Sequence, residues 1–159
     1  MSTLSRWPSS FLVLATLVAA TGCGTALTIE VRGIAPLNQT DNDESTPVNA
    51  RIYQLASDAK FRNAVVDQLW TNDKATLGDD RIGSPKVVTV LPGAAGDKPV
   101  SVDLGELAAG THFIGILALY RRSDAVDKRV LIVPVDGFGD KVVQFTRYSV
   151  TLLPAGNGK

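Results

Sequence analysis

The chain has 159 residues, of which 45% are apolar, and this is the usual size of one globular domain with its own core. Lys and Arg number 16, as do Asp and Glu, so the net charge is zero and the basic surplus typical of nucleic-acid-binding proteins is missing. One cysteine and one histidine exclude an internal disulfide framework and zinc sites that need several of either residue.

The N-terminal segment predicts an export signal. A polar start that carries Arg6 is followed by a ten-residue apolar run from Phe11 to Ala20, about half the length of a membrane-spanning helix. The next residues complete Ala-Thr-Gly-Cys at positions 20–23, which resembles the lipobox where bacterial lipoproteins are cleaved and lipidated. We therefore expect a signal peptide over 1–22, lipid on Cys23 and a periplasmic domain over 23–159. An ordinary secretory signal beside an unrelated cysteine is the alternative.

The residue after the cysteine bears on the destination. Enteric lipoproteins that stay in the inner membrane carry Asp at this position, whereas this chain has Gly24. The expected location is therefore the periplasmic face of the outer membrane. Several acyl chains on Cys23 would hold the protein there, since each buried CH2 group contributes about 0.8 kcal/mol. This covalent lipid is the only non-protein group that we expect, with no other cofactor.

Beyond the signal, apolar and polar residues mostly alternate with the period of two that is typical of β-strands. We expect strands over 27–32, 48–53, 87–91, 100–104, 113–120 and 130–133. The apolar run 113–120 predicts a central strand that is covered on both faces. In the segment 142–153 the apolar positions change phase, which predicts one strand with a bulge near Thr146 and Arg147.

One segment has helical spacing instead. Ser57 is a candidate cap for a helix over 58–70, whose apolar stripe holds Phe61, Ala64, Val65 and Leu69. A further helical turn over 74–77 would end at Gly78. The predicted fold is all-β, a two-sheet β-sandwich of seven or eight strands with a helical insertion at about 57–78.

Catalytic and metal-binding patterns are missing from the sequence. A Ser-His-Asp or Cys-His site would need His112, which opens an apolar strand, and Cys23 is assigned to the lipid. Asp79 and Asp80 fit a solvated turn better than a carboxylate pair. The acidic run 41–44 lacks the spacing and the glycine of an EF-hand, so a solvated loop is favoured over a cation site. The sequence predicts a protein that is not an enzyme, with no catalytic residue and no metal ligand.

Several motifs in combination resemble the type VI secretion lipoprotein family, TssJ. The lipobox-like residues directly precede a strand, and a polar loop opens at Leu37-Asn38 and ends at Thr46-Pro47. The run RIYQL at 51–55 is similar to the R-I-Y-Q-L strand of the family, and FIGILALYR at 113–121 is similar to its Y-I-G-V-x-A-x-Y-R strand. The resemblance covers essentially the whole chain after residue 22.

This resemblance implies a transthyretin-like β-sandwich on an outer-membrane lipoprotein that faces the periplasm. It implies that the protein tethers the type VI membrane complex by binding the periplasmic C-terminal domain of the inner-membrane protein TssM. The family makes that contact with the loop between its first two strands. Carried to this sequence, the partner-binding residues are Ala35, Pro36, Leu37, Asn38, Gln39, Thr40, Asp41, Asn42, Asp43, Glu44, Ser45 and Thr46.

Strand geometry points to the same loop. The first strand begins two to four residues after Cys23, and eight strand residues at about 3.3 Å each place its far end about 25 Å from the lipid. A polar loop at that end faces the periplasm, and loops on rigid scaffolds commonly carry binding sites. Leu37 is the expected apolar anchor. Asp41, Asp43 and Glu44 would steer a basic partner surface toward the loop.

Three alternatives stay open. A periplasmic lipoprotein that binds a carbohydrate or a small molecule would use Trp70, Tyr53 and Tyr120, although core packing is the preferred use of all three. A hydrolase that uses Asp79, Asp80 or His112 lacks a recognisable nucleophile and base. The basic pairs at 121–122 and 128–129 predict the two sides of a charged hairpin, which fits a solvated loop better than a partner-binding patch.

Overall fold

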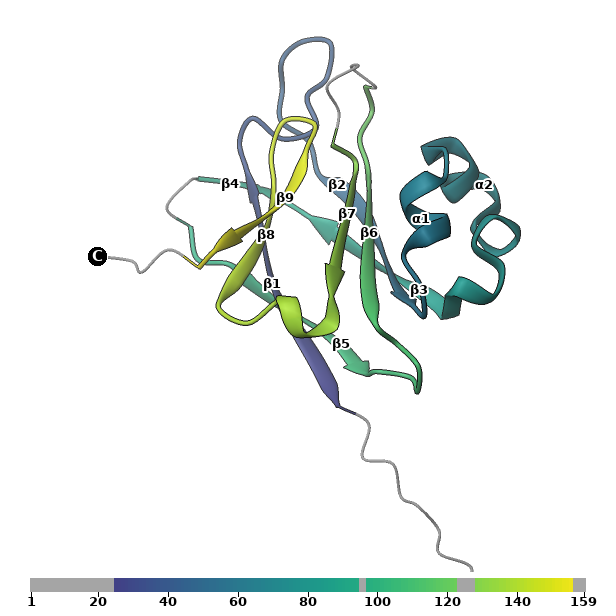
Figure 1. Cartoon of the computed structure of the whole chain (residues 1–159). Helices are drawn as coiled ribbons and strands as arrows, with labels where there is room; N and C mark the ends of the chain where they lie inside the picture. Colours follow the sequence, from purple (N-terminus) through teal and green to yellow (C-terminus); the bar gives the residue numbers. More distant parts are fainter. Residues whose placement is uncertain (1–24, 95–96, 123–127, 156–159) are drawn as a thin grey trace, which may run out of the picture.

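The computed structural model describes residues 25–94, 97–122 and 128–155 (Figure 1). The predicted signal peptide and Cys23 lie outside these residues. Within them, no helix has both the length and the apolar character needed to cross a membrane.

The described chain forms two β-sheets with a small helical part against one of them. In chain order the elements are β1 (Ala26–Ile34), β2 (Val48–Leu55), α1 (Ala59–Asn63), α2 (Val66–Leu77), β3 (Arg81–Val90), β4 (Pro92–Gly93), β5 (Val100–Glu106), β6 (Phe113–Leu119), β7 (Val130–Pro134), β8 (Lys141–Phe145) and β9 (Val150–Pro154). The first sheet has the order β4-β1-β8-β9, with β5 also paired to β1, and the second has the order β3-β2-β6-β7. The predicted two-sheet sandwich with a helical insertion is confirmed.

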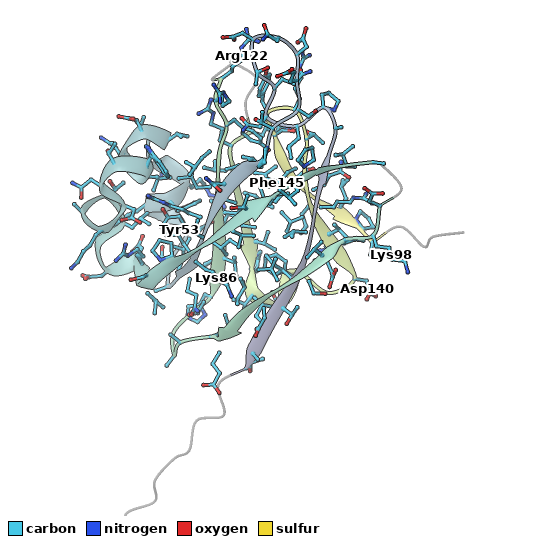
Figure 2. All side chains as sticks on the ribbon, turned by 180° about the vertical axis from the view of Figure 1, so that it is seen from behind. Tyr53, Lys86, Lys98, Arg122, Asp140 and Phe145 are labelled. Atoms are coloured by element: carbon cyan, nitrogen blue, oxygen red, sulfur yellow. The ribbon has the colours of Figure 1, made fainter. Side chains whose placement is uncertain are left out.

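The main core lies between the two sheets. Alternate residues of most strands point into it, such as Ile29 and Val31 of β1 and Ile114 and Ile116 of β6. Phe145 of β8 is in the same cluster (Figure 2). The strict alternation along β1 is what the sequence pattern predicts for a sheet with one buried face.

Strand β6 is covered on both faces, as its apolar run predicts. Its even-numbered residues enter the main core, whereas Leu117 belongs to a second cluster under the helices. The fully buried residues of this second cluster are Tyr53, Leu55, Phe61, Leu69, Leu77 and Leu117. Gly115 makes the close packing possible, because a Cβ atom there would lie 2.9 Å from Leu55 Cδ1 and 3.0 Å from Phe61 Cζ.

The helical insertion differs from the prediction within the segment 58–70, which the sequence predicts as one continuous helix. The chain is extended at Ala64, the C-cap of α1, and at Val65, the N-cap of α2. A second break lies inside α2 at Asn72, whose φ of −148° and ψ of 51° are not helical, so the chain kinks between the predicted helix over 58–70 and the predicted turn over 74–77. Val65 lies at the first break and is 60% exposed rather than buried. The predicted end is confirmed: Gly78 caps α2 with φ +52° and donates its N–H to the Lys74 carbonyl.

The C-terminal segment is also different from the prediction. The expected single bulged strand is two antiparallel strands, β8 and β9, joined by a turn over 146–149. The Thr146 N–H donates to the Ser149 carbonyl at 2.9 Å, and the two hydroxyls lie 2.7 Å apart. The change of phase in the sequence therefore marks the turn of a hairpin.

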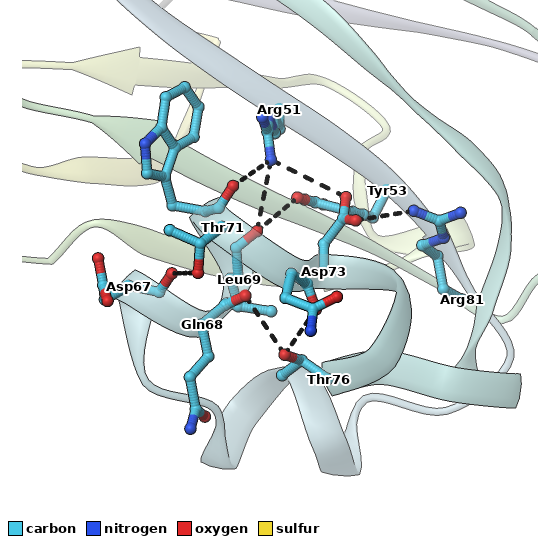
Figure 3. Close-up of polar contacts among 11 residues, drawn as sticks. Arg51, Tyr53, Asp67, Gln68, Leu69, Thr71, Asp73, Thr76 and Arg81 are labelled. Atoms are coloured by element: carbon cyan, nitrogen blue, oxygen red, sulfur yellow. Dashed lines mark hydrogen bonds and ion pairs between the residues drawn. The ribbon is translucent and has the colours of Figure 1, made fainter.

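Polar contacts fasten the helical insertion to β2 (Figure 3). The Arg51 guanidinium donates to the Trp70 carbonyl at 2.9 Å and stacks 4.1 Å from the Trp70 ring centroid. Asp73 lies 3.9 Å from Arg51 and accepts a 3.0 Å hydrogen bond from Arg81. The Tyr53 hydroxyl donates to the Leu69 carbonyl, and burial raises the pKa of Tyr53 above its usual value of 10.0. These contacts pair polar atoms of α2 with side chains of β2 and β3, beside the apolar cluster that lies under the helices.

We expect Gly115→Ala to lower the free energy of unfolding by about 1–3 kcal/mol, because the added methyl group displaces the Leu55 side chain and the Phe61 ring. Urea denaturation of the purified protein measures this. In a Phe61→Leu background the smaller side chain leaves room, and the same substitution should cost less. An equal cost in both backgrounds would show that Phe61 is not the obstacle.

Candidate partner-binding surface

The β1–β2 loop (residues 35–46) lies at the end of the sandwich opposite the start of β1 (Figure 1). β1 begins at Ala26, three residues after Cys23, and runs the length of the molecule to Ile34. Residues 120–122, which follow β6, and the β8–β9 turn lie at the same end as the loop (Figure 1). We call this the loop end of the sandwich.

The outer part of the loop, residues 40–44, is a tight turn that we call the tip. The Thr40 N–H donates to the Glu44 carbonyl at 3.0 Å, and the Asp43 N–H donates to the Thr40 carbonyl at 3.1 Å. The Thr40 hydroxyl accepts from the N–H groups of Asn42 and Glu44. The backbone of the tip is therefore held by its own hydrogen bonds, while the side chains of residues 41–44 are exposed.

Asn38 fastens the base of the loop to the rest of the loop end. It is only 4% exposed, and its Nδ2 donates to the Pro47 carbonyl at 2.6 Å. Its Oδ1 accepts from the Arg121 N–H at 2.8 Å, and its own N–H donates to the Arg147 carbonyl at 2.9 Å. The Thr46 hydroxyl donates to its carbonyl at 2.6 Å. One buried residue thus joins both sides of the loop, the end of β6 and the β8–β9 turn.

The prediction that Leu37 anchors the partner is wrong for this conformation. Its side chain is 0% exposed and packs in the main core with β1 and β2. Gln39 is also buried: its Nε2 donates to the Asp43 carbonyl, while its Oε1 has no hydrogen-bond partner. The apolar residue that the sequence offered as a contact instead holds the loop on the sandwich.

The exposed side chains of the tip are mostly acidic, and basic side chains stand beside them. Asp41 Oδ1 lies 3.9 Å from Arg122 Nε, and Asp43 Oδ1 lies 3.8 Å from an Arg147 terminal nitrogen. Figure 2 places Arg122 at this end of the molecule. The Arg147 guanidinium also lies 5.7 Å from the Tyr148 ring centroid. The loop end therefore combines an acidic tip with adjacent arginines.

The other residues considered for chemistry lie apart from the loop. His112 is exposed and makes backbone hydrogen bonds to Leu55 and Val135. Asp79 and Asp80 belong to a short 3-10 turn, where Asp80 pairs with Lys60 at 3.9 Å. Across residues 25–94, 97–122 and 128–155, no three His, Cys, Asp or Glu side chains gather into a possible metal site.

A pocket of about 530 Å³ opens between α2 and the end of β6. Trp70 and Tyr120, two of the three aromatic residues considered for ligand binding, line it together with Arg129. The third, Tyr53, is fully buried under the helices. Trp70 is 44% exposed, and the Arg51 guanidinium covers one face of its ring.

Sequence reasoning identified the loop but missed Arg147 as a member of the same surface. The hydrogen bond from the Arg121 N–H to Asn38 joins residues that are 83 positions apart, and Arg147 is still farther along the chain. Contacts over such separations leave no local pattern. The only sequence signal near Arg147 was the change of phase, which we interpreted as a bulge.

We expect Asn38→Ala to lower the free energy of unfolding by about 1–3 kcal/mol, because it leaves the Pro47 carbonyl and the Arg121 N–H without their partner. Asn42→Ala, at an exposed position of the tip, is the matched control and should change it by less than about 0.5 kcal/mol. Urea denaturation of both variants is the measurement. Equal stability of the two would contradict the role of Asn38.

Comparison with known proteins identifies the family. Residues 25–151 match the family model described as "Type VI secretion lipoprotein, VasD, EvfM, TssJ, VC_A0113". No curated protein matches the sequence.

Among solved structures, the lipoprotein TssJ1 of Pseudomonas aeruginosa superposes with a TM-score of 0.68 at 22% identity, covering 82% of this chain and 96% of that one. A chain of the structure named "Type VI membrane complex" superposes with a TM-score of 0.69 at 25% identity, covering 81% of this chain and 98% of that one. A chain of the structure named "T6SS protein TssM C-terminal domain (869-1107) from EAEC" superposes with a TM-score of 0.67 at 24% identity, again covering 81% of this chain and 98% of that one. Because the family model spans most of the sequence and the fold agrees, this chain belongs to the type VI secretion lipoprotein family.

Proposed function

We propose that this protein is an outer-membrane lipoprotein that binds the periplasmic C-terminal domain of TssM and so tethers the type VI secretion membrane complex. The β1–β2 loop is the binding element in this proposal, and Cys23 carries the lipid. The observation that carries it is the placement of the loop, with its exposed acidic tip, at the end of the sandwich opposite the start of β1.

The named structures support the choice of partner. The alignment covers 98% of the chain matched in the TssM structure but only 81% of the 159 residues of this protein, so the matched chain has fewer than 159 residues. The named range 869–1107 is much longer. The matched chain is therefore shorter than the named domain. A small subunit of this fold beside TssM accounts for the match, and the membrane-complex structure also contains such a chain.

The anchoring geometry supports the role of the loop. If Cys23 is lipidated, only two residues separate it from Ala26, where β1 begins. The start of β1 then sits at the membrane surface. The nine residues of β1 span about 30 Å, so the loop end reaches into the periplasm, where a protein of the inner membrane can meet it.

The buried base and the exposed tip suit a docking role. The hydrogen bonds of Asn38 and Thr40 fix the backbone before any partner arrives, so binding does not have to order it. Asp41, Asp43 and Glu44 give the tip a negative field that attracts a basic surface and speeds association at low salt. The proposed role is non-enzymatic, in keeping with a family of secretion-system lipoproteins.

The ligand-binding alternative has one observation in its favour, the pocket lined by Trp70 and Tyr120. Two contacts count against it. The Arg51 guanidinium occupies one face of the Trp70 ring, and the Tyr120 hydroxyl already donates to the Ser149 carbonyl at 2.7 Å. Neither aromatic residue therefore offers its full binding capacity to a sugar or a small molecule.

The direct test measures the affinity of the detergent-purified full chain for the TssM of the same bacterium. The isosteric triple variant Asp41→Asn, Asp43→Asn, Glu44→Gln removes the charge of the tip and should raise the dissociation constant about ten-fold or more at low salt. Deleting the whole loop is a poorer test, because it would also remove the buried Leu37 and Asn38.

The matched control is Asp79→Asn, Glu106→Gln, Asp136→Asn, which makes the same charge change at exposed positions away from the loop. We expect it to bind TssM with the affinity of the natural protein. If the natural protein fails to bind TssM, or if both triple variants lose affinity equally, the proposed docking element is wrong.

A further inference from the structure

We infer that the docking surface is wider than the β1–β2 loop and also includes Arg122 at the end of β6 and Arg147 in the β8–β9 turn. This inference rests on the proposed function and adds the kind of surface that the partner must present. Such a mixed surface fits a partner face with basic groups at its centre, opposite the tip, and acidic groups around them, opposite the arginines.

The three segments are held as one body. Asn38 accepts from the Arg121 N–H at 2.8 Å and donates to the Arg147 carbonyl at 2.9 Å. The neighbouring Tyr120 hydroxyl donates to the Ser149 carbonyl at 2.7 Å, and its ring meets that of Tyr148 edge-on at 6.2 Å. A partner that contacts the tip therefore meets the backbone of the other two segments at fixed positions, with their side chains beside it.

Two ion pairs join the tip to the neighbouring arginines. Their distances are 3.9 Å for Asp41 with Arg122 and 3.8 Å for Asp43 with Arg147. All four side chains are about half exposed or more, and Asp41 is 94% exposed. Long, exposed pairs of this kind contribute little to stability. The carboxylates of Asp41 and Asp43 and the Arg147 guanidinium can therefore turn to an incoming partner without a large loss of folding free energy.

The arginines exclude the simplest partner surface. A wholly basic face would be attracted by the tip and repelled by Arg122 and Arg147, which lie within 4 Å of its carboxylates. An acidic group on the partner removes this repulsion and can accept two parallel hydrogen bonds from a guanidinium. The Arg147 guanidinium lies 5.7 Å from the Tyr148 ring centroid, beside the tip and close enough to meet such a group.

The opposing interpretation is that the arginines only offset repulsion among the acidic side chains of the free protein. The two interpretations predict changes of opposite sign. If the partner face is wholly basic, Arg147→Glu makes the surface more acidic and tightens binding. If the partner face has acidic groups opposite the arginines, the same substitution weakens binding.

The experiment measures TssM binding to the detergent-purified full chain with Arg122→Glu, Arg147→Glu or Arg147→Gln. We expect the dissociation constant to rise about ten-fold for each Glu variant and by less for the Gln variant. Arg62→Glu is the matched control, since Arg62 is 63% exposed and pairs with Asp58 on α1. Its affinity should stay within about two-fold of that of the natural protein.

Melting temperatures separate binding from folding, and each variant should melt within about 4 °C of the natural protein, because exposed ion pairs contribute little. The Gln variant introduces no new charge beside Asp43, so a loss of affinity in this variant cannot come from repulsion that distorts the loop. If the natural protein does not bind TssM, the proposed function fails. If it binds and Arg147→Glu binds equally or more tightly, only the wider surface is overturned.

Discussion

The loop end of this protein depends on one buried side chain amide. The Nδ2, the Oδ1, the backbone N–H and the backbone carbonyl of Asn38 each form a hydrogen bond with a different residue. These four residues lie on the other side of the loop, at the end of β6 and in the β8–β9 turn. Buried polar groups that are fully paired in this way fix one arrangement, because each lost bond would leave a partner unsatisfied. The exposed tip can therefore vary in sequence while its base keeps its shape.

The RIYQL motif, on which the family resemblance partly rests, supports the fold and not the loop end. In the RIYQL strand, Arg51 and Tyr53 hold the helical insertion, Ile52 enters the main core and Leu55 lies under α1. The Gln54 Oε1 accepts from the Ala108 N–H at 2.8 Å and from the Thr111 hydroxyl at 3.0 Å, which fixes the turn before β6. The motif is thus a pattern of packing and backbone support, and it carries no contact of the loop end.

Periodicity predicted most strands of the two sheets, but it missed residues 81–86 of β3 and the two-residue β4. The alternation in β1 and β2 and the doubly covered β6 follow directly from which residues are apolar. It failed where backbone geometry decides, because an extended residue such as Ala64 breaks a helix without changing the apolar spacing, and a turn at 146–149 produces the same change of phase as a bulge.

The loop was located correctly by geometry, yet Leu37 was assigned the wrong role. An apolar residue in a polar loop has the same sequence appearance whether it faces a partner or returns to the core. Only the long-range contacts of the loop distinguish the two, and those contacts also bring Arg147 beside Asp43. The proposed partner surface is therefore the part of the protein that sequence describes least.

The proposed function requires a chain held at one end by lipid and at the other by TssM. A pull-down from detergent-solubilised envelopes, comparing the natural protein with Cys23→Ser and using mass spectrometry of the N-terminus and of the captured proteins, tests both ends together. We predict a lipidated N-terminal cysteine in the outer-membrane fraction, TssM among the captured proteins, and loss of membrane attachment in Cys23→Ser. A lipidated protein that captures no TssM, or an unmodified Cys23, would contradict the account.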